Sequence, residues 1–247
     1  MKRLIILIFF MIFLASCNMA GNPCIKIKEE KLKLELQKAF NASFDKILEK
    51  NEIKGTNICQ IIVEQAGNFG VLYVSSDSKT FFVGGEVYKD GVFLGKAALT
   101  KIYERVFLDF KHEIEKIVAF SYKPEGTKKY IYMITDPDCS FCEKAKGLVK
   151  DWADARKVEV KVILFPLEKI HPQAKDKSVR GICSGMNYND YLNSKWDGKL
   201  CEEGSKKIND TIALMKKIAV NGTPTFISYN GKRFIGFSQE GLDKIIE

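Results

Sequence analysis

The chain has 247 residues, of which 46% are hydrophobic and 28% are charged, an ordinary globular composition with length for one large or two small domains. Its net charge of +8 comes from lysines scattered among acidic residues, without the arginine-rich or aromatic-interleaved stripe that follows a phosphate backbone. These features exclude a low-complexity chain and argue against nucleic acid as a partner.

Residues 1–16 have the pattern of an export signal, because the basic pair Lys2-Arg3 precedes an apolar run too short to remain as a spanning helix. Residues 14–17 match the bacterial lipobox, in which the cysteine becomes a lipid-bearing N-terminus. We therefore expect Cys17 to carry a lipid anchor. The alternative is an ordinary signal peptide in which Cys17 is incidental. Export favours a compartment in which structural disulfides persist.

Apolar residues recur at helical spacing from Glu29 to Lys50, with lysines and glutamates on the other face, which predicts an amphipathic helix over 29–50. We assign residues 17–43 to a tether with this N-terminal helix. Packing of its apolar stripe in a core is favoured over contact with a membrane or a partner.

Short β-type runs separated by turn residues follow, which is typical of a small antiparallel sheet in a domain of residues 44–98. The expected strands are residues 58–63, 71–74, 80–83 and 86–88. Such a short sheet makes a thin core, so a second copy of the chain is the natural cover for one face. This domain is therefore predicted to make a homodimer.

A broad apolar stripe over residues 99–121 predicts a linker helix. Residues 122–247 then alternate strand, helix and strand before a helical insertion at about 168–219. The expected strands are 128–135, 158–165, 225–229 and 233–237, and the expected helices include 143–155 and 239–246. Asn230-Gly231 predicts a type I′ turn between the last two strands.

Cys139 and Cys142 lie three positions apart where an apolar strand meets a helix. Cys139 is thereby placed at an exposed helix N-terminus, where unpaired N–H groups and the helix dipole stabilise a thiolate. We interpret Cys139 as the nucleophile that attacks a substrate disulfide, and Cys142 as the thiol that releases a stalled mixed disulfide. Negative charge on Asp136, Asp138 and Glu143 should oppose the field of the helix.

Two other interpretations of this pair are weaker. A zinc half-site needs a second half, but the remaining candidates, Cys183 and Cys201, have poor ligand spacing, and the only histidines are His112 and His171. A purely structural disulfide would close a tight, strained ring. We therefore expect a redox-active disulfide, with no metal and no cofactor.

Thr223-Pro224 precedes the next apolar strand, about eighty residues beyond the cysteines. The dipeptide alone is compatible with a simple turn, since X-Pro bonds are seldom cis. Together with the upstream cysteines it favours a cis proline beside the active site, and the paired motifs are typical of thioredoxin-like domains. A substrate segment would then bind at Thr223 and Pro224 as an added strand.

Four further cysteines remain. Cys183 and Cys201 bracket the helical insertion, and a bridge between them would contribute roughly 3 kcal/mol by limiting the unfolded chain. Cys24 and Cys59 are a third pair by parity alone. They either bridge each other, bridge two protomers or stay free.

The chain resembles the bacterial periplasmic disulfide-isomerase family of the DsbC/DsbG type from about Phe44 to its C-terminus. The resemblance rests on Gly70 to Val74 with the following hairpin, the linker helix, Thr135-Asp136 with Cys139-Ser140-Phe141-Cys142, Phe165-Pro166, Cys183, and Gly222-Thr223-Pro224. It implies an α+β dimerisation domain joined by the linker helix to an α/β thioredoxin fold. It also implies a V-shaped homodimer whose cleft holds misfolded protein, and a structural disulfide between Cys183 and Cys201.

The resemblance further implies that a membrane thiol-reductant protein of the DsbD type keeps Cys139 and Cys142 reduced. We therefore expect a lipid-anchored periplasmic thiol-disulfide isomerase or reductase that acts on misfolded, disulfide-containing exported proteins. The alternatives are a dithiol oxidase of the same fold and a redox-inert chaperone.

Overall fold

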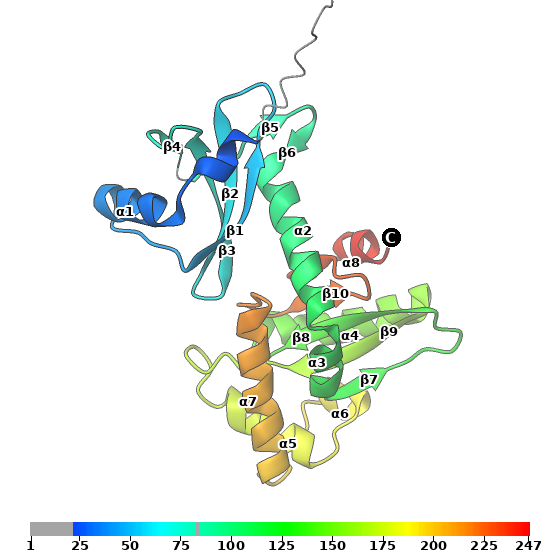
Figure 1. The fold of residues 1–247 in the computed structure, drawn as a ribbon. Coiled ribbons are helices and arrows are strands. Elements are labelled where there is room, and N and C mark those ends of the chain that lie inside the picture. The colour runs from blue at the N-terminus through cyan, green and yellow to red at the C-terminus, as the bar shows by residue number, and fades with distance from the viewer. Residues whose placement is uncertain (1–21, 83) are drawn as a thin grey trace, which may run out of the picture.

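A computed structural model describes residues 22–82 and 84–247 (Figure 1). The expected export signal over residues 1–16 and the expected lipid site at Cys17 lie outside the described residues. In the described part, an N-terminal unit built on an antiparallel sheet is followed by a long helix and a larger C-terminal unit. We call them the sheet domain, residues 22–93, and the C-terminal domain, residues 118–247.

The sheet domain contains a four-stranded antiparallel sheet in the order β1-β2-β3-β4. Its elements are η1 (Pro23–Lys26), α1 (Glu29–Phe40), β1 (Lys46–Glu52), β2 (Ile58–Gln65), β3 (Asn68–Ser75), β4 (Phe81–Phe82) and a hairpin of β5 (Tyr88–Lys89) with β6 (Val92–Phe93). Cys24, Leu32, Leu36, Cys59 and Ile61 belong to one buried cluster, which holds η1 and α1 against one face of the sheet.

The predicted helix over 29–50 is wrong beyond residue 40. Asn41 takes a left-handed conformation, with φ of 48°, and its N–H donates to the carbonyls of Leu36 and Gln37. This left-handed cap ends the helix. Residues 46–52 instead form β1, because pairing with β2 satisfies their backbone groups. Phe44, in the connection, is buried in the cluster beneath the sheet.

The long helix also differs from its predicted bounds of 99–121. α2 spans Leu94–Asp109 and α3 spans Lys111–Ile117, with a break at Phe110, where φ and ψ are −103° and 11°. Residues that were expected to end the helix form the edge strand β7 (Phe120–Tyr122) instead. Pairing of β7 with β9 accounts for the change from helix to strand.

The C-terminal domain is a five-stranded sheet in the order β11-β10-β8-β9-β7, in which only β8 and β9 are parallel. Its remaining strands are β8 (Lys129–Thr135), β9 (Val158–Leu164), β10 (Thr225–Ser228) and β11 (Arg233–Ile235), and its helices are α4 (Ser140–Arg156), α5 (Ala174–Cys183), α6 (Tyr188–Leu192), α7 (Glu202–Lys217) and α8 (Gln239–Ile246).

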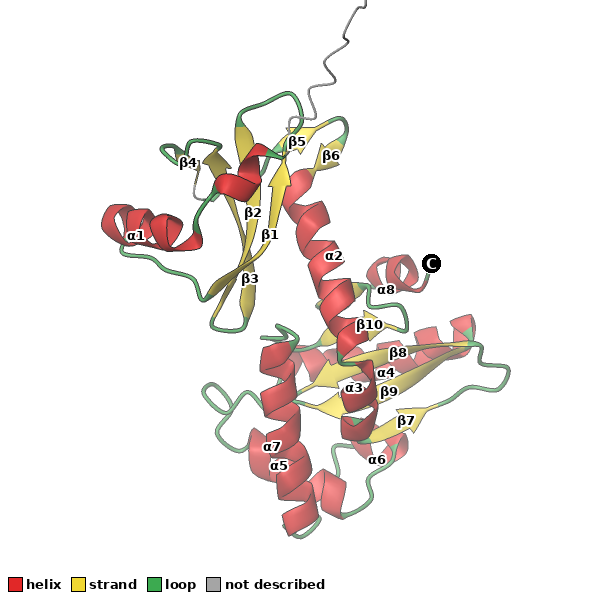
Figure 2. Ribbon diagram, in the orientation of Figure 1, coloured by secondary structure: helices red, strands yellow, loops and turns green. Residues whose placement is uncertain are grey.

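Helices cover both faces of this sheet (Figure 2). Side chains alternate along β8, so Ile131 and Met133 pack toward α4 and α8, whereas Tyr132 and Ile134 pack toward α3 and α7. The two-sided core leaves the carboxyl end of β8 at a fixed position, where α4 begins.

The turn between β10 and β11 is not the predicted type I′ turn. Of its residues Tyr229, Asn230 and Gly231, only Gly231 has a positive φ, of 91°, and the N–H of Gly231 is donated to the carbonyl of Ser228. This pattern is a three-residue hairpin connection with glycine at the left-handed position. None of the helices in the described residues is long and apolar enough to cross a membrane.

Candidate active site at the start of helix α4

Cys139 caps helix α4, which begins at the next residue. Its Sγ accepts the backbone N–H of Cys142 at 3.4 Å, and its own N–H is donated to the carbonyl of Asp136. The side chain of Asp136 accepts the N–H of Asp138 at 2.7 Å, which fixes the turn between the strand and the helix. The sulfur of Cys139 therefore lies in the positive field of the helix N-terminus.

Cys139 is less accessible than the sequence suggested. Only 6% of Cys139 and 1% of Cys142 is exposed, and both thiols are free. The expectation of an exposed Cys139 is wrong because the segment before β10 covers it: the Sγ of Cys139 lies 3.4 Å from the carbonyl oxygen of Thr223 and donates to it. The peptide bond between Thr223 and Pro224 is cis.

The two thiols differ in environment. Burial raises the pKa of Cys142 to about 12, although Thr135, the backbone of Asp136 and Thr223 offer it hydrogen bonds that partly oppose this shift. Cys142 therefore stays a neutral thiol near pH 7, whereas Cys139 occupies the position where a helix stabilises an anion. The two sulfurs, one helical turn apart, therefore have unequal environments.

Each acidic residue near the cysteines has a cationic or basic neighbour. Lys177 of α5 pairs with Asp138, and Lys146 pairs with Glu143 at 2.7 Å. The third acid, Asp136, is 2% exposed and lies 3.1 Å from Nδ1 of His171, an atom that makes no hydrogen bond of ordinary geometry. The negative charges of Asp138 and Glu143, which we expected to act on Cys139, are thus each paired with a lysine.

Asp136 also joins two segments of the site. Besides the N–H of Asp138, it accepts the N–H of Leu167 at 2.6 Å, from the segment that follows β9. A buried carboxylate that accepts two backbone N–H groups holds the active-site turn and this segment in one arrangement. The sequence analysis noted Asp136 for its charge and as part of the family resemblance, and it missed these two backbone hydrogen bonds.

The helical insertion reaches the site through α6. The hydroxyl of Tyr191 lies 2.8 Å from the hydroxyl of Thr135 at the end of β8. Lys146, which is 5% exposed, donates to the carbonyl of Tyr191 and to the hydroxyl of Ser194. Neither Tyr191 nor Lys146 stands out in the sequence, because their contacts connect segments some fifty residues apart. The rim of the site is apolar at Phe141, which is 70% exposed.

The other four described cysteines form two disulfides away from this site. Cys183 at the end of α5 bridges Cys201 before α7, and Cys24 bridges Cys59 of β2. The three possibilities left open for Cys24 and Cys59 therefore reduce to a bridge within one chain. Among the residues that the structure describes, no group of three or more histidines, cysteines and acids is placed to hold a metal ion.

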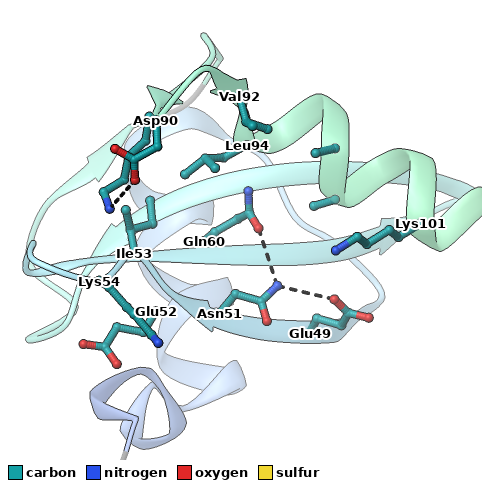
Figure 3. A pocket seen from close by; sticks show the side chains of 13 residues that line it. Glu49, Asn51, Glu52, Ile53, Lys54, Gln60, Asp90, Val92, Leu94 and Lys101 are labelled. Atoms are coloured by element: carbon teal, nitrogen blue, oxygen red, sulfur yellow. Dashed lines mark hydrogen bonds and ion pairs between the residues drawn. The ribbon is translucent and has the colours of Figure 1, made fainter.

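A separate hollow lies in the sheet domain, between β1 and α2, with a volume of about 560 Å³ (Figure 3). Gln60, Asn51 and Glu49 line it from the sheet, and Lys101 lines it from α2. None of the cysteines contributes to it, so the hollow is distinct from the site at α4.

A thioredoxin-like domain family matches residues 118–247, more than half of the chain. The thiol:disulfide interchange protein DsbC of Salmonella typhimurium is 27% identical over 164 residues, which are 66% of this chain and 66% of that protein. The match thus spans about two thirds of the relative. DsbC of Escherichia coli K12 is 26% identical over 207 residues, which are 81% of this chain and 84% of that protein.

A solved structure supports the fold. A linker-deletion variant of Proteus mirabilis ScsC matches with a TM-score of 0.50 at 14% identity, over 61% of this chain and 83% of that one. At 14% identity the match supports a similarity of fold alone.

Proposed function

Because the chain belongs to the thioredoxin-like family, as a thiol:disulfide oxidoreductase of the DsbC/DsbG type, we propose that it rearranges non-native disulfides in exported proteins through Cys139. The observation that carries this proposal is the pair of unequal free thiols: Cys139 caps α4, and Cys142 lies buried one turn away with a raised pKa. An attacking thiolate beside a protected thiol is the arrangement that disulfide exchange needs.

The reaction begins when the Cys139 thiolate attacks one sulfur of a substrate disulfide. A mixed disulfide forms, and the other substrate sulfur leaves as a thiolate. In isomerisation that thiolate, or another in the substrate, attacks a new partner, and a final attack on the mixed disulfide restores the Cys139 thiolate without net oxidation. The Thr223–Pro224 segment would bind the substrate backbone beside the sulfur, since its carbonyl already faces Cys139.

Cys142 acts when rearrangement stalls. It transfers its proton to the departing substrate sulfur and attacks the Sγ of Cys139, which releases a reduced substrate and leaves a Cys139–Cys142 disulfide. Two electrons have then passed to the substrate, so a reductant must restore the dithiol. A membrane thiol-reductant protein of the DsbD type is the proposed donor.

The setting of the protein is part of the proposal. Residues 1–17 support export to the periplasm and a lipid anchor at Cys17. A homodimer is supported by exposed apolar side chains at the end of the sheet domain, namely Phe82, Tyr88, Val92 and Phe93. Sedimentation of the exported form across a concentration series measures this association.

The activity is tested by refolding a scrambled multi-disulfide protein with the wild type, Cys139→Ala and Cys142→Ala. The proposal predicts that Cys139→Ala abolishes the acceleration, whereas Cys142→Ala keeps isomerisation and accumulates a mixed disulfide. Equal rates for all three would favour the redox-inert chaperone. Faster oxidation of a reduced substrate by a preformed Cys139–Cys142 disulfide, without isomerisation, would favour the oxidase.

A further inference from the structure

The tip of the β2–β3 hairpin contacts the C-terminal domain at Lys216 and Asn221. A side chain on Gly67 would place its Cβ 2.8 Å from the carbonyl oxygen of Lys216 near the end of α7. The next residue, Asn68, accepts a hydrogen bond from the side-chain amide of Asn221. Figure 1 shows this turn of the sheet domain at the same end of α7. The hairpin therefore approaches the residues that lead to the cis peptide bond.

Arg233 on β11 makes a second connection to the same place. Its Nη1 and Nη2 each donate at 2.7 Å, to the carbonyls of Ala219 and Ile218 respectively. These carbonyls follow α7, where the helix dipole also favours a cation. The guanidinium lies 4.5 Å from the ring centroid of Tyr103 on α2. Burial lowers the pKa of Arg233 to about 10, so it is still charged at neutral pH.

Tyr103 extends this connection back to the sheet domain, because its ring packs 5.4 Å from the ring of Phe69 on β3. Phe69 follows Asn68 directly, so the hairpin and Arg233 belong to one continuous set of contacts. Both connections end on residues 218–224, which we call the Pro224 loop. Within that loop, the carbonyl of Thr223 contacts the sulfur of Cys139.

We propose that Asn68 and Arg233 are positioning residues through which the sheet domain sets the geometry of the Pro224 loop, and thereby the binding of polypeptide disulfides. This inference rests on the proposed function. The sheet domain of the same chain would then tune substrate binding directly.

The effect should depend on the size of the substrate. A small aromatic disulfide needs little more than access to Cys139, whereas a polypeptide must also lay its backbone along the Pro224 loop. Loss of one neutral hydrogen bond changes an equilibrium constant by a factor of roughly three to ten. A misplaced loop should therefore raise KM for a protein substrate more than for a small one.

The experiment compares the full-length wild type, Asn68→Ala and Arg233→Met with Arg156→Met as the matched control. Arg156 also pairs with a neighbour, Asp243, but it lies at the opposite end of α4 from Cys139. The substrates are a scrambled multi-disulfide protein and dithiobis(nitrobenzoate). We expect KM for the protein to rise roughly threefold to tenfold in Asn68→Ala and Arg233→Met, with much smaller changes for the small disulfide. Arg156→Met should match the wild type.

Hydrogen exchange gives an independent measurement that does not rely on turnover. Backbone amides of the Pro224 loop should exchange faster in Asn68→Ala and Arg233→Met than in Arg156→Met. Asn68 lies on the surface, so its variant keeps the test informative if Arg233→Met fails to fold. Unchanged protein kinetics and unchanged exchange in Asn68→Ala overturn the inference, as does an equal loss with both substrates. A wild type that catalyses no interchange refutes the proposed function itself.

Discussion

The sheet domain and the C-terminal domain differ in how their sheets are covered. Helices cover both faces of the five-stranded sheet, and each face has its own buried cluster. In the sheet domain, η1 and α1 cover one face, while α2 on the other side leaves an open hollow. The two free cysteines therefore lie in the domain whose sheet is covered on both faces, and the hollow lies in the other domain.

The largest expected effect concerns the two disulfides. Cys24–Cys59 closes a loop with a sequence separation of 35, and Cys183–Cys201 one of 18, which correspond to about 4 and about 3 kcal/mol on the chain-entropy estimate. Replacing both cysteines of a pair by serine should therefore destabilise the sheet domain more than the insertion. Denaturant unfolding followed by residue-resolved hydrogen exchange measures both losses. A smaller loss at the first pair would contradict the ranking of the two disulfides by loop length.

The next effect sharpens the role of Asp136 in the C-terminal domain. In Asp136→Asn the amide keeps one acceptor oxygen, so the N–H of Asp138 or of Leu167 loses its partner. We expect a loss of about 1–3 kcal/mol in the free energy of unfolding and slower interchange. Urea unfolding and the refolding assay measure the two. Wild-type stability would show that the carboxylate does not hold these segments together.

A smaller effect is expected from the charge of Asp138. Asp138→Asn removes a negative charge beside Cys139 and leaves Lys177 without its partner, and both changes favour a thiolate. Alkylation of Cys139 should therefore become roughly twofold to threefold faster at neutral pH, a modest change because the pair is partly exposed. Slower alkylation than in the wild type would contradict the electrostatic account.

The smallest effect belongs to Asp243 on α8, far from the cysteines. Hydrogen bonds from Arg156 and Trp152 lower its pKa from 3.8 to about 2. Ionised Asp243 therefore stabilises the folded protein fully at a pH above its ordinary pKa of 3.8, and this stabilisation is lost as the pH falls through about 2. Asp243→Asn should cost less than about 1 kcal/mol at pH 7, since the pair is exposed. The difference in stability between Asp243→Asn and the wild type, measured by thermal unfolding, should become smaller as the pH is lowered from 4 to 2. A difference that does not depend on pH would assign the effect to packing.

Much of the C-terminal domain could be predicted from local sequence patterns. The strand before Cys139, the helix after it and the cis bond at Pro224 all follow from short motifs whose turn chemistry is distinctive. The end of α1 was missed because the helical spacing of apolar residues continues past Asn41, where only pairing with β2 shows that a strand begins.

Contacts distant in sequence limited the prediction of the site. The burial of Cys139 depends on Thr223, and the arrangement of Asp136 depends on Leu167 and His171. The Cys24–Cys59 bridge was equally hidden, since parity alone allows several pairings. Motif spacing identifies reactive groups, whereas their accessibility and partners are set by tertiary packing.

Peptide-mapped alkylation of the fully reduced protein tests the central claim most directly. Near pH 7, iodoacetamide should modify Cys139 well before Cys142, because the first caps α4 and the second is buried with a pKa raised to about 12. Modification of Cys142 first, or of both cysteines at the same rate, would contradict the account.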